Sequence, residues 1–211
     1  MRPRPAIVLP LLALALLIAL ILAVLLGKGS SSPSPSATYA NPTGNSGFDG
    51  AALPAGIAAP DFTLTDQDGR SISLKQFRGR VTVLAFLYST CGAPCVLIAQ
   101  QIRGALDELH DPPPVLIVSA DPHADTPAHV SRFLGEVSLA GRVRYLTGPP
   151  SQLRKIWRAY RVTPASAGRR AFALHASVLL IDGRGDERVV FQSEQLTPES
   201  LAHDIGKLLD P

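Results

Sequence analysis

The apolar run at residues 81–88, which reads VTVLAFLY, constrains the fold of this chain more than any other feature. Such a nearly continuous run is typical of a central β-strand that is covered on both faces. A helical stretch is predicted from about Ala93 to His110, and a second buried strand follows it at Val115–Val118. Because a strand, a helix and another strand alternate, the sequence predicts an α/β domain.

The segments around this unit complete the predicted domain. Two short alternating segments flank the turn Asp66–Gly69, which predicts a β-hairpin ahead of the central strand. The other predicted elements are helices at Thr126–Leu139 and Ser151–Tyr160, strands at Ser177–Ile181 and Glu187–Phe191, and a last helix at Pro198–Leu209 with Thr197 as its N-cap. We therefore expect a thioredoxin-like domain with a central mixed sheet and an N-terminal β-hairpin.

An apolar segment of 21 residues without a charged side chain, residues 6–26, precedes this domain. About 20 such residues cross the hydrocarbon core of a membrane as a helix. A cleaved signal peptide is the alternative, but its apolar region usually spans only about 7–15 residues. With Arg2 and Arg4 ahead of the segment, the positive-inside rule puts the N-terminus in the cytoplasm. We expect residues 1–27 to be a transmembrane helix, a single-pass anchor in the cell membrane with the domain on the extracytoplasmic side.

A flexible linker is predicted to join this anchor to the domain. Residues 28–56 are rich in Gly, Ser and Pro, a composition that cannot bury a core, and residues 57–211 are assigned to the domain. The net charge of +3 resides in Arg2, Arg4 and Lys28, so the domain has no basic excess with which to bind nucleic acid. Only two cysteines are present, which excludes a disulfide-stapled mini-protein and a four-cysteine zinc site.

These two cysteines, Cys91 and Cys95, stand where the buried strand meets the following helix. The unpaired N–H groups at a helix N-terminus stabilise a thiolate and lower the pKa of the thiol. Three interpretations remain open: a structural disulfide, a redox pair that exchanges disulfides, and a metal site that needs at least one more ligand. The structural disulfide is the weakest, because closing so short a loop stabilises a fold less than a long-loop crosslink does.

His175 is the histidine best placed to supply a further ligand. It precedes the predicted strand Ser177–Ile181, at an edge where α/β sheets commonly carry their sites. From the residues alone, the alternative is a partly buried histidine that bonds to a backbone carbonyl. Solvated surface positions are predicted for the other four histidines, which are His110, His123, His129 and His203.

Several stretches, taken together, resemble the Sco/SenC family. They are Phe86–Cys91 with Cys95, Val118–Pro127, and His175 ahead of Val178–Asp182. The resemblance covers about residues 57–209 and implies a membrane-tethered, thioredoxin-like copper protein that helps to assemble the binuclear copper centre of cytochrome c oxidase. The family's copper ligands, two cysteines and a histidine, map onto Cys91, Cys95 and His175. The family commonly has a proline after each cysteine, and Gly92 and Val96 stand there instead.

The resemblance also implies partners. They are the copper-accepting subunit of cytochrome c oxidase and, in addition, a copper donor protein or a thiol reductant. Two thiolates and an imidazole are a soft donor set that suits Cu(I) and also accepts Cu(II). Asp121 and Asp125 are interpreted as turn and helix-cap residues, and the resemblance implies a further role for Asp125 near the copper.

Two enzymatic alternatives compete with a copper chaperone, which is not an enzyme in the turnover sense. A thiol–disulfide oxidoreductase would use the same pair, with Cys91 as the attacking thiolate. The two roles are compatible, because a target dithiol must be reduced before it takes up metal. A peroxidase of the peroxiredoxin class is rejected, because Leu84 and Tyr88 occupy the positions of its active-site proline and threonine.

Overall fold

The computed structural model describes residues 46–210. The predicted anchor, residues 1–27, and most of the predicted linker lie outside the described residues. Within residues 46–210, no helix combines the length and the apolar character that a membrane span requires.

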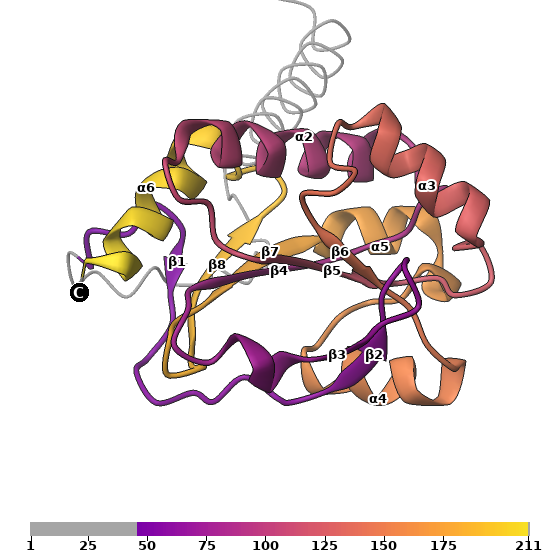
Figure 1. Ribbon diagram of the computed structural model, residues 1–211, viewed down its shortest axis with the longest axis horizontal. Helices are drawn as coiled ribbons and strands as arrows, with labels where there is room; N and C mark the ends of the chain where they lie inside the picture. The colour runs from indigo at the N-terminus through magenta and orange to yellow at the C-terminus, as the bar shows by residue number, and fades with distance from the viewer. Residues whose placement is uncertain (1–45, 211) are drawn as a thin grey trace, which may run out of the picture. The chain divides into compact units, whose positions relative to one another are not determined.

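A six-stranded mixed sheet forms the centre of the described chain, in the order β1-β8-β7-β4-β5-β6 (Figure 1). β5 is parallel to β4 and to β6, whereas β7 is antiparallel to both of its neighbours, β4 and β8. The strands are β1 (Ala51–Ala52), β4 (Thr82–Leu87), β5 (Val115–Ser119), β6 (Arg144–Leu146), β7 (Ser177–Ile181) and β8 (Glu187–Gln192). The observed strand order therefore confirms the prediction of a central β-strand within a mixed sheet.

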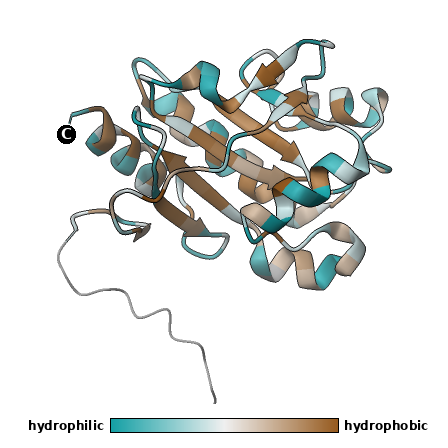
Figure 2. Cartoon of the chain, turned by 90° about the horizontal axis from the view of Figure 1, so that it is seen from below, coloured by the Kyte–Doolittle hydropathy of each residue, from teal (hydrophilic) through white to brown (hydrophobic). Residues whose placement is uncertain are grey.

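The central strand β4 is buried along its whole length because both faces of the sheet are covered. Val83 and Ala85 belong to one cluster of buried side chains, and Leu84 and Phe86 belong to the other. Figure 2 shows the resulting hydrophobic strands between more polar outer elements. Burial on both faces explains why the sequence of this strand is apolar almost throughout and does not alternate between apolar and polar residues.

The helices divide between the two faces. α2 (Ala93–Glu108), α3 (Pro127–Glu136), α5 (Arg169–His175) and α6 (Pro198–Leu209) contribute to the first cluster, while α4 (Pro150–Ala159) and the hairpin of β2 (Thr63–Thr65) and β3 (Ser71–Ser73) contribute to the second (Figure 1). Two short 3-10 helices, η2 (Leu74–Phe77) and η3 (Ala165–Ala167), complete the described elements. The hairpin is confirmed, and so is the last helix, whose N-cap Thr197 forms a capping box with Ser200.

Besides the two 3-10 helices, three elements of the structure were not predicted from the sequence: β1, β6 and α5. β1 pairs with β8 through Ala51 opposite Val190. The structured backbone therefore begins ahead of Ile57, inside the segment that its composition assigned to the linker. α5 matters most for the site, because it ends at His175.

Candidate functional site

Strand direction brings three segments that are distant in sequence to one edge of the sheet. β4 and β5 are parallel, with Leu87 opposite Ser119, so the loops that follow both strands leave the sheet at the same edge. β7 is antiparallel to β4 and therefore begins there. The cysteine pair follows β4, Asp125 follows β5, and His175 precedes β7. This is the edge at which α/β sheets commonly carry their sites.

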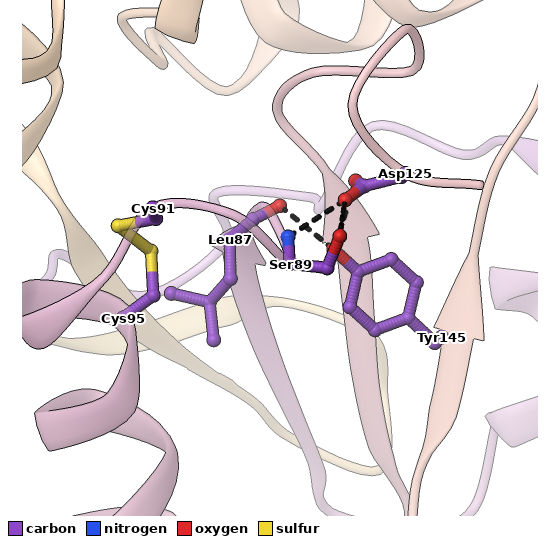
Figure 3. The surroundings of a disulfide bond; sticks show 6 residues. All are labelled: Leu87, Ser89, Cys91, Cys95, Asp125 and Tyr145. Atoms are coloured by element: carbon purple, nitrogen blue, oxygen red, sulfur yellow. Dashed lines mark hydrogen bonds between the residues drawn. A yellow bond between two sulfur atoms is a disulfide. The ribbon is translucent and has the colours of Figure 1, made fainter. Parts of the chain in front are cut away.

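Cys91 and Cys95 form a disulfide at the start of α2, with Cα atoms 5.7 Å apart (Figure 3). Cys91 is 8% exposed and Cys95 is fully buried, so Cys91 is the sulfur that a reductant reaches first. Gly92 between them is the N-cap of α2 and has φ +83°. A proline, whose φ is fixed near about −65°, cannot adopt this conformation. Glycine at the family's proline position therefore permits a loop conformation that a proline would exclude.

His175 is the last residue of α5, and it is exposed. Its Nδ1 lies 2.8 Å from the carbonyl oxygen of Ala171. When Nδ1 donates its proton in that bond, Nε2 carries a free lone pair, which is the form in which an imidazole binds a metal. The alternative predicted from the sequence, a partly buried histidine that bonds to a backbone carbonyl, is therefore met only in part. The hydrogen bond is present, but the residue is exposed.

The structure joins the two sulfurs but does not gather His175 with them into a ready ligand cluster. Within residues 46–210, one group of His, Cys, Asp or Glu side chains has three ligand atoms all within 4.8 Å of one another: Asp49, His203 and Asp204. A metal takes up thiolates rather than disulfide sulfurs. The set Cys91, Cys95 and His175 therefore remains a prediction for the reduced chain.

Asp125 holds the cysteine loop to the rest of this edge (Figure 3). Its Oδ1 accepts hydrogen bonds from both the backbone N–H and the hydroxyl of Ser89, each at 2.6 Å. Its Oδ2 accepts from the hydroxyls of Ser119 at 2.5 Å and Tyr145 at 2.8 Å. Burial raises the pKa of the Asp125 carboxyl, although the hydrogen bonds from these three residues act in the opposite direction.

The prediction that Asp125 caps a helix is wrong. The N-cap of α3 is Thr126, whose side chain accepts the backbone N–H of His129. The Asp125 carboxylate is buried instead, because three hydroxyls and a backbone N–H converge on it from other segments. The turn role of Asp121 is confirmed, since its Oδ1 accepts the backbone N–H groups of His123 and Ala124.

One comparison bears on the peroxidase alternative. Peroxiredoxin Bcp of Escherichia coli (strain K12) is 39% identical over 83 residues, which are 38% of this chain and 50% of that protein. Leu84 and Tyr88 nevertheless stand at the proline and threonine positions of the peroxiredoxin pattern, and both are buried. The two chains are therefore similar over a shared segment of the fold, but this chain lacks the proline and the threonine of the peroxiredoxin pattern.

The SCO1/SenC family model matches residues 51–210 of this chain. Protein SenC of Rhodobacter capsulatus is 28% identical over 163 residues, 74% of this chain and 72% of SenC. The structure of Bradyrhizobium japonicum ScoI with copper bound superposes with a TM-score of 0.54 at 26% identity, covering 72% of this chain and 99% of ScoI. The matches to the mitochondrial SCO1 homolog 1 of Arabidopsis thaliana and SCO2 homolog of Bos taurus span 34% and 43% of those proteins. The fold is thus the thioredoxin-like α/β fold of solved Sco structures, and the chain belongs to the SCO1/SenC family.

Proposed function

We propose that the chain is a copper-binding assembly protein, which delivers copper to the binuclear centre of cytochrome c oxidase or assists the assembly of that centre. Its ligands are Cys91, Cys95 and His175. The observation that carries the proposal is that a reducible cysteine pair and a histidine whose Nδ1 is held by a backbone carbonyl lie at the same edge of the sheet, although they are not yet gathered into one ligand cluster. The copper in the related ScoI supports the choice of metal.

Loading requires prior reduction of the disulfide. Two electrons and two protons convert the bonded sulfurs to thiols, which lose their protons when they bind a metal. Two thiolates and one imidazole are a soft set that holds Cu(I) and also accepts Cu(II). Because the Nδ1 proton of His175 is engaged by Ala171, Nε2 is the atom that completes the set.

The proposed setting is extracytoplasmic, with residues 1–27 as a membrane anchor. The copper-accepting oxidase subunit is the partner that receives the metal, and a copper donor or a thiol reductant acts before it. The intact mass of the chain purified from membranes tests the anchor. A mass near 22.3 kDa supports it, and loss of the first residues as a cleaved peptide contradicts it.

Copper titration of the reduced full chain, with a competing Cu(I) chelator, tests the ligand set. We expect one copper per chain, and we expect His175→Ala to weaken binding at least about tenfold. His129→Ala is the matched control, because the Nδ1 of His129 also lies 2.8 Å from a backbone carbonyl, that of Ala124. Equal copper affinities for the two variants would remove His175 from the set.

A second function, thiol–disulfide exchange with a partner, is favoured by the disulfide itself and by the greater exposure of Cys91. His175 has no part in that chemistry. Reduction of a substrate disulfide by the reduced chain should therefore survive His175→Ala and be lost in Cys91→Ser. Loss of both copper binding and exchange in Cys91→Ser, with loss of copper binding alone in His175→Ala, would show that both activities use this cysteine pair.

A further inference from the structure

Tyr88 is the first residue after β4 and lies beside the cysteine pair. Its carbonyl oxygen accepts the backbone N–H of Cys91 at 3.1 Å. The side chain is 3% exposed, and its hydroxyl has no hydrogen-bond partner among residues 46–210. A buried polar group without a partner destabilises the state in which it occurs. A phenylalanine would fill the same volume without that penalty, so packing does not explain the hydroxyl.

The ring of Tyr88 connects the cysteine loop with the helix that carries His175. Its centroid lies 5.0 Å from that of Phe172, with the two rings at 72° in an edge-to-face contact. Phe172 belongs to α5 and stands one helical turn before His175. Both rings and both cysteine side chains are members of the same buried cluster. Tyr88 therefore contacts the cysteine loop through its backbone and the helix that carries His175 through its ring.

The hydroxyl is a donor throughout the neutral pH range. Burial raises the pKa of Tyr88 above its ordinary value of 10.0; Asp121 and Asp125 act in the same direction, and Arg169 acts against them. The phenol therefore keeps its proton. What it lacks in the disulfide form is an acceptor.

We propose that Tyr88 is a positioning residue whose hydroxyl gains an acceptor, a cysteine sulfur, when the Cys91–Cys95 disulfide is reduced. A hydrogen bond to that sulfur removes the penalty that the unpaired, buried hydroxyl carries in the disulfide form. Breaking the S–S bond also frees the two sulfurs to separate. Tyr88 thereby favours the dithiol form over the disulfide form, and the dithiol is the form that takes up copper if the proposed function holds.

Glutathione reduces the disulfide in two exchange steps. The thiolates of two glutathione molecules attack in succession, the Cys91–Cys95 bond breaks, and a new S–S bond forms between the two glutathione sulfurs. Two electrons pass to the cysteine sulfurs, and the protons lost by the glutathione thiols go to the cysteines or to the buffer. Tyr88 takes no part in the electron transfer; it stabilises one product.

The test is the redox equilibrium of the full chain in glutathione buffers without copper, read by thiol alkylation and mass measurement. Tyr88→Phe should lower the equilibrium constant for reduction about tenfold, which is about 30 mV for this two-electron couple. The same variant should leave the stability of the disulfide form against denaturant unchanged or higher, since the hydroxyl removed there has no partner.

Tyr160→Phe is the matched control. Its hydroxyl donates to the carbonyl of Pro60 at 2.6 Å, and its ring packs against the second cluster, on the other face of the sheet. This variant should lower the stability of the disulfide form and leave the redox equilibrium within about twofold of the unchanged chain. The proposal is overturned if Tyr88→Phe also stays within that range, or if it weakens the disulfide form as Tyr160→Phe does. Because copper is absent, neither result depends on whether the site binds copper.

Discussion

Asp125 shows how a single buried carboxylate can order a reactive loop. Its two oxygens accept four hydrogen bonds, and the donors come from Ser89, Ser119 and Tyr145, on three different segments. Ser89 stands two residues before Cys91. Through Ser89 and Asp125, the loop that carries the first sulfur is thus connected to two other strands of the sheet. A loop held only by its own backbone hydrogen bonds would lack this connection.

Removing this carboxylate should loosen the loop and destabilise the domain. Asp125→Ala leaves a backbone N–H and three hydroxyls without their acceptor, so the free energy of unfolding should fall by about 3 kcal/mol or more. Asp121→Ala is the comparison, because it removes only two long turn hydrogen bonds at 3.2 and 3.3 Å. That loss should be about 1 kcal/mol or less in denaturant unfolding. Equal losses in the two variants would contradict the anchoring role of Asp125.

The pKa of Asp125 gives a further prediction with a definite sign. Its folded-state pKa is raised above 3.8, mainly by burial, so the folded chain holds this proton more tightly than the unfolded chain does. The stability from this group is complete below 3.8 and is lost as the pH rises through the folded pKa. As the pH rises through that interval, the unchanged chain should lose stability relative to Asp125→Asn. Above the interval, the free energies of unfolding of the two chains should change with pH in parallel. A stability difference that grows with pH instead would mean that the pKa is lowered.

The residues of this edge differ in how far the sequence reveals them. Cys91 and Cys95 were placed correctly at the strand–helix junction, because a buried strand and a proline in the first helical turn mark it. The role of Asp125 was missed, since its partners are 6 to 36 positions away and no local pattern links them. The unpaired hydroxyl of Tyr88 is a property of packing alone.

At the scale of elements, long or strongly patterned segments were predictable and short ones were not. β4 and β5 carry continuous apolar runs, and α6 begins with a capping box. β6 has three residues, too few for a period, and β1 is an Ala–Ala pair with no strand propensity of its own. α5 has seven residues and its N-cap, Gly168, has no side chain with which to cap it, so it carries no helix signal strong enough to detect.

A residue of the last helix holds the segment directly before β1. Asp204 of α6 is fully buried, and its two oxygens accept the backbone N–H groups of Asp49 and Gly50, each at 2.9 Å. Asp204→Ala should free the segment before β1 and lower the free energy of unfolding by about 2 kcal/mol, with faster hydrogen exchange at both amides. His203→Ala removes a single contact with this carboxylate, between Nδ1 and Asp204 Oδ1 at 2.9 Å, from an exposed ring, so it should lower the free energy of unfolding by about 1 kcal/mol or less. Unaltered exchange in Asp204→Ala would show that pairing with β8 alone holds β1.

At the scale of the whole molecule, the proposed function makes copper binding depend on the redox state of one disulfide. The bond closes a loop between residues only four positions apart, so it constrains the unfolded chain weakly. The disulfide and dithiol forms without metal should therefore differ little in stability. A ligand that binds the folded dithiol form and not the unfolded chain adds its binding free energy to the stability of the domain.

Copper should consequently stabilise the reduced chain and not the disulfide form. At a free copper concentration about 100 times the Kd, the free energy of unfolding of the reduced chain should rise by about 2.7 kcal/mol. Buffered Cu(I) in anaerobic denaturant titrations of both forms measures this, and His175→Ala should reduce the rise. Equal stabilisation of both forms would mean that copper binds away from the cysteines. The group of Asp49, His203 and Asp204 is then the site to examine, and loss of the effect in His203→Ala would identify it.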